Sequence, residues 1–574
     1  MDIKRGLLWM VFLFSVLTLY SQWNIYNGKP PLFGPPPPSA STAAASASAN
    51  GSKPAGTTPA VTAAPGAMTT ASASPTEAPF KSEDVTITTD VFKATFDTAG
   101  AKLKRLELLQ YQETKAEWLG DVVMDKIHGV QEQKDRPNVV IFDSTADRTY
   151  LAETGLTDAG LPGIDSGYTV RPGDRTLANG DSVQLVFDAE KNGVKLTKTF
   201  TFRRGQYAID LKHDVTNNTA AAIAPTLDLR LVRDGTLPKN PRFAPNPYTG
   251  PAAYTESEHF QKQAFEDITK GKNAWPKQAN DGWVAMIQHF FVSTFVPAAN
   301  TPRELYSKAL GNNLFAVGSM QHFPSIAPGA TGSIDTTLYS GPQDTAALDK
   351  ISSTLSLTRD YGMFKLVAQP IFLIMDQIHK LIGNWGWTII AFTVLMKIVL
   401  YPLAAASFRS MAKTKQLQPK MTSIRERHKD DPQKMNQAMM ELYKTEKINP
   451  LGGCLPLLVQ MPIFIALYSV LSASVETRDA AWIGWVHDLS TPDPYSILPL
   501  IMAVAMFFQT RLSPAPPDPT QAKVMMFMPI AFSVMFFMFP SGVVLYYVVN
   551  TVLSIAQQQF INKRLATAPV AKKA

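Results

Sequence analysis

Cysteine is almost absent from this chain, because Cys454 is the only one in 574 residues. An intramolecular disulfide is therefore excluded, and any part outside the cytoplasm must be stabilised by its packed core alone. Common enzyme motifs are also missing: the sequence has no G-x-S-x-G, no H-E-x-x-H and no phosphate-binding glycine loop. We expect no catalytic residues, metal site, cofactor or nucleotide hydrolysis, and predict that the protein is not an enzyme.

Aspartate and glutamate are missing from the long apolar runs of the chain. Proton-coupled transporters commonly relay protons on carboxylates inside the membrane, so this absence argues against that class. Each run approaches the roughly 20 residues that a membrane-spanning helix needs, and together they predict six spans. The runs lie within residues 1–27, at 383–404, and in four segments of 451–560, at 455–474, 495–510, 524–540 and 541–560.

The N-terminus has the pattern of a signal peptide, with Lys4 and Arg5 before an apolar run. No small-x-small cleavage site follows that run at the required distance, and Trp23 and Tyr26 are typical of a membrane–water interface. We predict that residues 1–27 are an uncleaved signal anchor; a cleaved signal peptide is the alternative. Residues 28–79 are rich in Pro, Ala and Ser and have little to bury, which predicts a disordered linker.

Residues 80–345 alternate between apolar and polar side chains, as β-strands do. Asn192-Gly193 separates two alternating runs and predicts a tight hairpin, and Arg204-Gly205 predicts a second turn. We expect a large all-β domain of the sandwich type, with a short helix near residues 345–356. Its histidines are scattered, and no carboxylate pair can be inferred, so a binding or spacer role is favoured over an enzymatic one.

Two further segments show helical periodicity. Residues 358–382 repeat apolar side chains every three or four positions, which predicts an amphipathic helix at the membrane interface; a packed core helix is the alternative. Residues 405–450 carry ten lysines and arginines and contain Asp431-Pro432, a helix-start signal between two apolar stripes. We interpret 405–450 as a cytoplasmic helical hairpin. Its cations either contact a ribosome or acidic lipids, or form a solvated face.

The charges of the loops set the orientation of the predicted spans. The hairpin and the tail at 561–574 are basic, whereas the 475–494 loop has Arg478 as its only lysine or arginine, beside four carboxylates. The positive-inside rule places the N-terminus, hairpin and C-terminus in the cytoplasm. The β domain then lies outside, in the periplasm of a Gram-negative bacterium, and the protein is located in the inner membrane.

One cation, Lys397, lies inside a predicted span, with Thr393 one turn before it on the same helix face. It is 14 residues from Gly383, about 21 Å, which leaves about 9 Å to the inner boundary of a 30 Å hydrocarbon core. Snorkelling to that boundary is therefore one interpretation. Convergence with polar groups of other spans into a hydrophilic cationic groove is the other. Those groups are Gln460, Tyr546, Tyr547, Asn550, Thr551 and Ser554.

Four stretches carry a resemblance to a known family. They are YPL (401–403), NPLGGCLPLLVQMPIFIALY (449–468), ILPLIMAVAMFFQ (497–509) and FMFPSGVVLYYVVN (537–550). The C-terminal part of the chain that contains them resembles the YidC–Oxa family of membrane-protein insertases. The anchor, linker and large outer domain match the arrangement of its Gram-negative members.

The resemblance implies a polytopic α-helical membrane protein with a five-helix core around a hydrophilic groove, plus a periplasmic β-supersandwich-like domain. Lys397, Thr393 and Tyr547 match groove positions, and Phe464 and Met502 match an apolar face that contacts substrate. Many Gram-negative members have arginine at the position of Lys397. Lysine keeps the charge but lacks the planar geometry that matches a carboxylate.

The implied function is to insert and chaperone inner-membrane proteins, alone or with the Sec translocon (SecYEG and SecDF). Implied partners are nascent membrane proteins, the Sec translocon, membrane lipids and the ribosome. The ribosome would be contacted through the hairpin and the basic tail. No nucleotide is needed, because burial of the substrate's apolar helix in lipid drives the step. Two other classes remain open from the residues: a small-anion channel or transporter using the same cation, and a membrane-anchored sugar-modifying enzyme.

Overall fold

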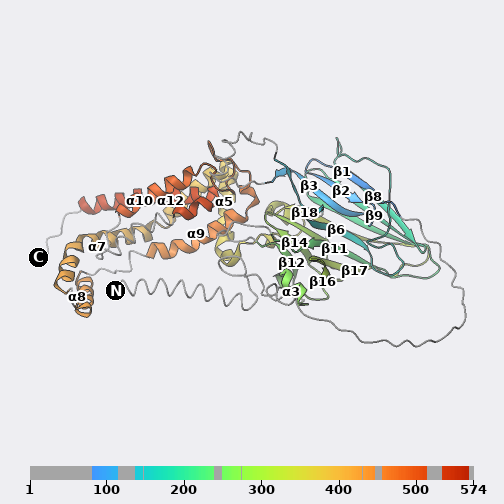
Figure 1. Cartoon of the computed structure of the whole chain (residues 1–574), viewed down its shortest axis with the longest axis horizontal. Helices are drawn as coiled ribbons and strands as arrows, with labels where there is room; N and C mark the ends of the chain where they lie inside the picture. The colour runs from blue at the N-terminus through green and yellow to red at the C-terminus, as the bar shows by residue number, and fades with distance from the viewer. Residues whose placement is uncertain are drawn as a thin grey trace, which may run out of the picture.

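The computed structural model describes residues 80–113, 136–145, 148–237, 248–272, 275–428, 431–446, 455–512 and 533–567. The predicted anchor, the linker and most of the predicted span at 524–540 lie outside the described residues, as does the tail beyond 567. A β domain occupies one end of the described molecule and a group of helices the other (Figure 1). Helix α5 (Lys365–Ile382) lies near the junction, and α8 (Pro432–Thr445) is at the end farthest from the β domain.

The β domain consists of two sheets that enclose one large apolar core. The order in the first is β1-β2-β3-β6-β11-β17-β16, with β4 beside β3 and β5 beside β6; in the second it is β13-β12-β14-β15-β18-β10-β9-β8-β7. The predicted all-β sandwich is confirmed. The strands are β1 (Asp84–Thr88), β2 (Phe92–Asp97), β3 (Lys102–Gln112), β4 (Asn138–Val140), β5 (Asp143–Ser144), β6 (Thr149–Leu156), β7 (Thr169–Val170), β8 (Ser182–Lys191), β9 (Val194–Arg203), β10 (Ala208–Asn217), β11 (Thr226–Asp234), β12 (Gly250–Thr255), β13 (His259–Lys262), β14 (Trp283–Gln288), β15 (Phe291–Pro297), β16 (Arg303–Gly311), β17 (Leu314–His322) and β18 (Thr331–Pro342).

Both turn predictions are confirmed. Asn192 and Gly193 join β8 to β9 with φ of 50° and 74°, the pair of positive values that a two-residue type I′ hairpin requires. Arg204-Gly205 joins β9 to β10, with Gly205 at φ 68°. The short helix expected near 345–356 is α4 (Thr345–Asp349), which Asp344 caps by accepting a hydrogen bond from the Ala346 amide.

A fully buried lysine, Lys198, links the two sheets of the sandwich. It lies on β9 among inward-facing aromatic residues, and its ammonium donates to the backbone carbonyls of Gly100, at 2.7 Å, and Thr154. The ammonium also lies 4.2 Å from the centre of the Tyr168 ring. Burial lowers the pKa of Lys198 to about 7. Alternation along β9 turns this position inward, but the carbonyls that receive the ammonium come from distant segments, and the buried cation was not predicted.

The stability of the protein is expected to rise with pH between about 7.5 and 9.5 because of Lys198. Its pKa falls from 10.5 to about 7 on folding, so in this window the unfolded chain holds a proton that the folded chain has released. The slope is at most about 1.4 kcal/mol per pH unit. Thermal unfolding of the full chain in detergent at several pH values should show this rise, and Lys198→Met should flatten it. Equal slopes for the two proteins would contradict the assignment.

The helical region is built around α12, which packs against α6, α7, α9 and α10, while α5 packs against α6 and α9. No single helix among the described residues meets the length and hydropathy expected of a membrane span, but α6 and α7 meet them as a pair bent by 66°. The longer helices are α6 (Trp385–Val399), α7 (Tyr401–Arg427), α9 (Leu455–Ala473), α10 (Ile497–Leu512) and α12 (Ser541–Thr567). Shorter ones are α3 (Phe265–Thr269), η1 (Leu355–Thr358), η2 (Gly362–Phe364), η4 (Val475–Thr477) and η5 (Phe536–Met538).

Residues 383–404 form parts of two helices rather than one. Helix α6 ends at Val399, and α7 begins at Tyr401 with Pro402 in its first turn. Proline has no amide hydrogen and clashes with the carbonyl four residues before it, so it is favoured in the first turn of a helix, where neither effect disrupts a helical hydrogen bond. The bend therefore places Lys397 two residues before the end of α6.

Helices α7 and α8 pack against each other at the end of the molecule farthest from the β domain. Leu417 and Met421 of α7 are buried against Met439, Leu442 and Tyr443 of α8. The predicted helix start is confirmed, because the Asp431 side chain accepts hydrogen bonds from the second and third amides of α8. The cytoplasmic location of this pair stays a prediction.

Helix α5 has one packed face and one exposed apolar face. Ala368, Ile371 and Met375 are buried in the helical core, whereas the Leu366 and Leu381 side chains are 88% exposed. The helix therefore has the packed face of a core helix and the exposed apolar face expected of an amphipathic interfacial helix, the two interpretations of residues 358–382. Its placement at a membrane interface stays a prediction.

Candidate functional site

The predicted groove cation, Lys397, reaches from α6 to α12. Its ammonium donates a hydrogen bond of 2.6 Å to the Ser554 hydroxyl. The Ser554 hydroxyl in turn donates to the Asn550 backbone carbonyl at 2.7 Å. Lys397 is half-buried and Ser554 is buried, so the charge is directed between the two helices.

The two partners lie at matching depths in their helices. Lys397 is 12 residues from Trp385, the start of α6, and Ser554 is 13 residues from Ser541, the start of α12. At 1.5 Å per residue these separations are about 18 and 20 Å. The contact is therefore deep within the helical region rather than at the ends that face the β domain.

Helix α12 carries a stripe of polar side chains around this contact. Asn550, Ser554 and Gln558 follow one another at four-residue steps, which places them on one helix face, and all three are buried. The Gln558 amide donates to the Leu512 carbonyl at the end of α10. Tyr546 lies two turns before Ser554 on α12 and is also buried.

Thr393, the second predicted groove residue, is one turn before Lys397 but is buried. Its hydroxyl donates to the Ile389 carbonyl of its own helix at 2.6 Å. The hydroxyl hydrogen of Thr393 is therefore used within α6, and its place in a groove stays a prediction.

Tyr547, the third predicted groove residue, contacts Phe464 from the predicted apolar face. The two rings meet edge to face, with centroids 5.4 Å apart and planes at 87°. The Tyr547 ring also contacts Phe536, at 5.0 Å between centroids. The structure thus joins the two predicted sets of residues at one aromatic cluster. Phe536 was not predicted, because it lies in a phenylalanine- and methionine-rich run with no distinguishing pattern.

Met502, the other residue assigned to the apolar face, is fully buried in the helical core. It presents no surface in this arrangement. Leu500, Val504 and Phe508 are the residues of α10 whose apolar side chains are more than half exposed.

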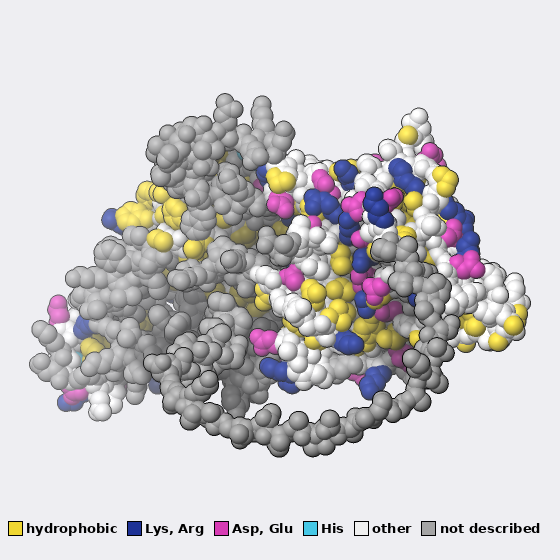
Figure 2. Space-filling model, turned by 45° about the vertical axis from the view of Figure 1, so that its right-hand side comes forward, with side chains coloured by type: hydrophobic (Ala, Val, Ile, Leu, Met, Phe, Trp, Pro, Cys, Tyr) yellow, Lys and Arg dark blue, Asp and Glu magenta, His cyan; other side chains and the backbone are white. Residues whose placement is uncertain are grey.

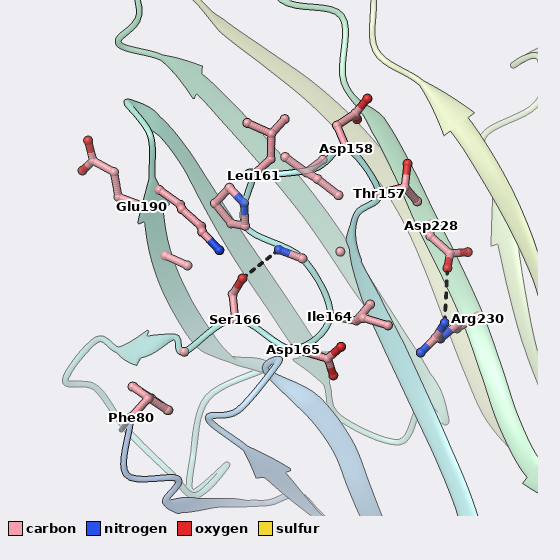
Figure 3. A pocket seen from close by; sticks show the side chains of 17 residues that line it. Phe80, Thr157, Asp158, Leu161, Ile164, Asp165, Ser166, Glu190, Asp228 and Arg230 are labelled. Atoms are coloured by element: carbon pink, nitrogen blue, oxygen red, sulfur yellow. Dashed lines mark hydrogen bonds and ion pairs between the residues drawn. The ribbon is translucent and has the colours of Figure 1, made fainter. Parts of the chain in front are cut away.

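The β domain has a polar hollow of about 810 Å³ beside β11 and the loop at residues 155–167 (Figure 3). One of its lining residues, Arg230, forms a 2.8 Å ion pair with Glu153. Another, Asp228, accepts a 2.7 Å hydrogen bond from the Tyr306 hydroxyl. Arg230 and Asp228 therefore already have ion-pair or hydrogen-bond partners within the protein. The hollow gives no reason to assign a catalytic activity to the β domain.

The surface of the β domain shows no concentration of one charge on the face drawn in Figure 2, where basic and acidic side chains are interspersed. Among the described residues, no group of three or more His, Cys, Asp or Glu could hold a metal ion. Lys397 and the polar residues of α12 near it are therefore the strongest candidate site in the described part of the chain.

Known proteins match the chain over almost its whole length. A family model described as "60Kd inner membrane protein" matches residues 377–568, and one described as "YidC periplasmic domain" matches residues 84–374. The membrane protein insertase YidC of Janthinobacterium sp. (strain Marseille) is 52% identical, over 98% of this chain and 99% of the relative. That of Ralstonia nicotianae is 50% identical over 99% of each chain. A crystal structure of an active YidC insertase is 20% identical, with a TM-score of 0.38, and covers 83% of this chain and 93% of that chain.

Proposed function

Because this chain belongs to the YidC family of membrane protein insertases, we propose that Lys397 and its polar neighbours form the groove through which it works. Relatives that match it from end to end at about 50% identity are insertases, so the chain inserts membrane proteins and is not an enzyme. Anion transport and sugar modification, left open by the residues, are no longer favoured.

The observation that carries the groove proposal is the deep, half-buried contact between Lys397 and Ser554. Moving a polar segment across hydrocarbon is costly because its backbone groups lose their water. A cation part-way across offsets this cost for an acidic segment. Two opposite charges 4 Å apart attract by about 4 kcal/mol at an effective dielectric constant of 20, against about 1 kcal/mol in water.

The substrate's apolar segment is proposed to leave the groove along the apolar face next to it. Phe464 supports this route, since it contacts Tyr547 and belongs to the predominantly apolar α9. On α10 the exposed Leu500, Val504 and Phe508 are better placed than Met502 to contact a passing helix. Burial of that helix in lipid then supplies the driving force.

The topology is proposed to follow the loop charges: six spans, five of them forming the core, with both termini in the cytoplasm. Figure 1 supports opposite locations for the β domain and the α7–α8 pair, because they lie at opposite ends of the helical region. The basic residues of the pair then face ribosomes or acidic lipids. Cooperation with SecYEG and SecDF, and a chaperone role, belong to the same proposal.

Replacement of Lys397 by glutamate is expected to reduce insertion of proteins with acidic translocated segments by about tenfold, equivalent to about 1.4 kcal/mol. The reason is that repulsion replaces attraction inside the groove. Insertion of a matched substrate with a neutral segment should change little. The measurement is protease protection of both substrates after synthesis in the presence of proteoliposomes.

Lys397→Met removes the attraction without adding repulsion. Its insertion defect should therefore be smaller than that of Lys397→Glu, but should again affect the acidic substrate more than the neutral one. Lys380→Glu is the matched control, because Lys380 is 61% exposed on α5, away from the groove. Equal insertion of acidic and neutral substrates by Lys397→Glu would exclude a charge role for Lys397.

A further inference from the structure

We propose that Ser554 is a positioning residue that holds the Lys397 ammonium inside the groove and prevents it from reaching the cytoplasmic boundary. The proposal rests on the proposed role of Lys397. A lysine side chain near a helix end in a membrane normally extends toward the nearest polar interface. Lys397 is two residues before the end of α6, yet its ammonium is bonded sideways to α12.

The orientation of the Ser554 hydroxyl suits it to receive a cation. A serine hydroxyl has one hydrogen to donate and two lone pairs that accept. Its hydrogen is used at the Asn550 carbonyl, so the lone pairs are left for Lys397. A hydrogen bond with a charged donor is about twice as strong as a neutral one, which makes this an effective anchor.

Ser554 leaves the ammonium free to bind substrate. A lysine ammonium has three donors, and Ser554 accepts one of them. Among the residues that the structure describes, no other acceptor bonds the ammonium, so its remaining donors are available to a carboxylate of an entering segment. Ser554 therefore fixes the position of the charge and does not compete for it.

The nearest predicted groove residue cannot replace Ser554 in this role. Thr393 is on the same helix as Lys397, and its hydroxyl is bonded to the Ile389 carbonyl. Only an acceptor on a different helix draws the ammonium away from the axis of α6. We infer that the pairing between α6 and α12 sets the depth at which acidic segments are received.

Ser554→Ala is expected to lower insertion of an acidic substrate about threefold and to leave a neutral substrate unchanged. Ser554→Thr keeps the hydroxyl and should restore the acidic substrate to near the wild-type level. Ser469→Ala is the matched control, because Ser469 on α9 makes the same type of bond to its own helix, to the Ile465 carbonyl, without meeting Lys397.

A second measurement tests whether the Lys397 ammonium is accessible from the cytoplasmic side. Full-length protein in proteoliposomes is treated from the cytoplasmic side with a water-soluble amine-acylating reagent, and modification of Lys397 is quantified by mass spectrometry. Ser554→Ala should raise the modification of Lys397 several-fold, since the released ammonium moves to the interface. Ser554→Thr and Ser469→Ala should match the wild type.

The outcomes separate this proposal from the one on which it rests. If Ser554→Ala changes neither the substrate preference nor the labelling, while Lys397→Met still impairs acidic substrates, the positioning role is overturned and the groove role stands. Equal loss of acidic and neutral substrates in Ser554→Ala would also overturn it, since that pattern indicates general damage. If Lys397→Met has no effect on either substrate, the groove role itself fails.

Discussion

Arg359→Met is expected to destabilise the full-length protein by about 3–5 kcal/mol, the usual cost of removing one partner of a buried ion pair. Arg359 is 2% exposed and forms a 2.6 Å ion pair with Glu476. It lies between the end of the β domain and α5, whereas Glu476 follows α9. The substitution therefore leaves a buried carboxylate without its cation at the junction of the two regions.

Arg359 holds several groups together at that junction. Its guanidinium donates to the Gln343 carbonyl, just after β18, at 3.2 Å and to the Tyr361 hydroxyl at 3.3 Å. It also lies 4.5 Å from the centre of the Phe372 ring on α5. A methionine fills part of the volume but satisfies none of these acceptors, so the loss exceeds that of the charge pair alone.

The defect of Arg359→Met should depend on pH. Burial raises the pKa of Glu476 even with Arg359 beside it, and removal of the cation raises that pKa further. A carboxyl whose pKa is higher in the folded state stabilises that state as pH falls, because the folded chain then binds more protons. The variant should therefore recover part of its lost stability as the pH is lowered from neutral.

Thermal unfolding midpoints of the full chain in detergent, at a fixed heating rate, test this prediction. Asp360→Asn is the control, because it removes the adjacent pair with Lys262, whose partners are each 31% exposed, and should cost less than about 1 kcal/mol. Arg359→Met combined with Glu476→Gln should be more stable than Arg359→Met alone. If Arg359→Met unfolds within a degree of the wild type, the pair does not hold the junction.

Neighbouring contacts show why the sequence did not reveal this junction. Arg478 was noted as the single lysine or arginine of an outer loop, a topology signal. In the structure its guanidinium contacts the Phe290 and Phe291 rings of the β domain at 5.5 and 5.4 Å. His289, one of the scattered histidines, bonds the Ser472 carbonyl at 2.8 Å. Contacts between residues almost 200 positions apart leave no local pattern.

Short sequence motifs predicted the structure correctly where it depends on interactions between neighbouring residues. The Asn192-Gly193 hairpin and the Asp431 cap depend on the conformation of a few adjacent residues, and both are present. The order of the strands depends on which distant segments pair, and alternation does not encode that. Lys198 shows the same limit: its position faces inward by alternation, but the carbonyls that make a buried lysine tolerable come from Gly100 and Thr154.

The candidate site was predictable as a set of residues but not as a geometry. Lys397 and Ser554 were both among the polar groups of the predicted spans, yet their pairing joins positions 157 apart. Met502 was placed on a substrate-contacting face by resemblance, and the packing of α10 against α12 buries that side chain in the helical core. Helix rotation is decided by the neighbours of a helix, which the sequence of the helix alone does not specify.

Gly386→Ala is expected to displace the 475–494 loop from α6 and to destabilise the protein by about 1–3 kcal/mol, the usual cost of overpacking. A Cβ at this position would lie 2.2–2.5 Å from the Cδ1, Cγ and Cβ atoms of Trp482. The Trp482 side chain cannot simply swing away, because its Cβ is among the clashing atoms and its ring packs on Trp387 at 5.9 Å. The loop is further tied to α6, since the Asn384 amide donates to the Ala481 carbonyl.

The unfolding midpoint of Gly386→Ala should therefore fall by several degrees, whereas Gly173→Ala, where no heavy atom lies within 4 Å of the added methyl, should not change it. Combination with Trp482→Gly separates a clash from an effect on the helix backbone. Glycine lacks all three atoms that meet the new methyl, so Gly386→Ala should cost much less stability in the Trp482→Gly background than in the wild type. If Gly386→Ala costs as much in both backgrounds, close packing of Trp482 on Gly386 is not what holds the 475–494 loop against α6.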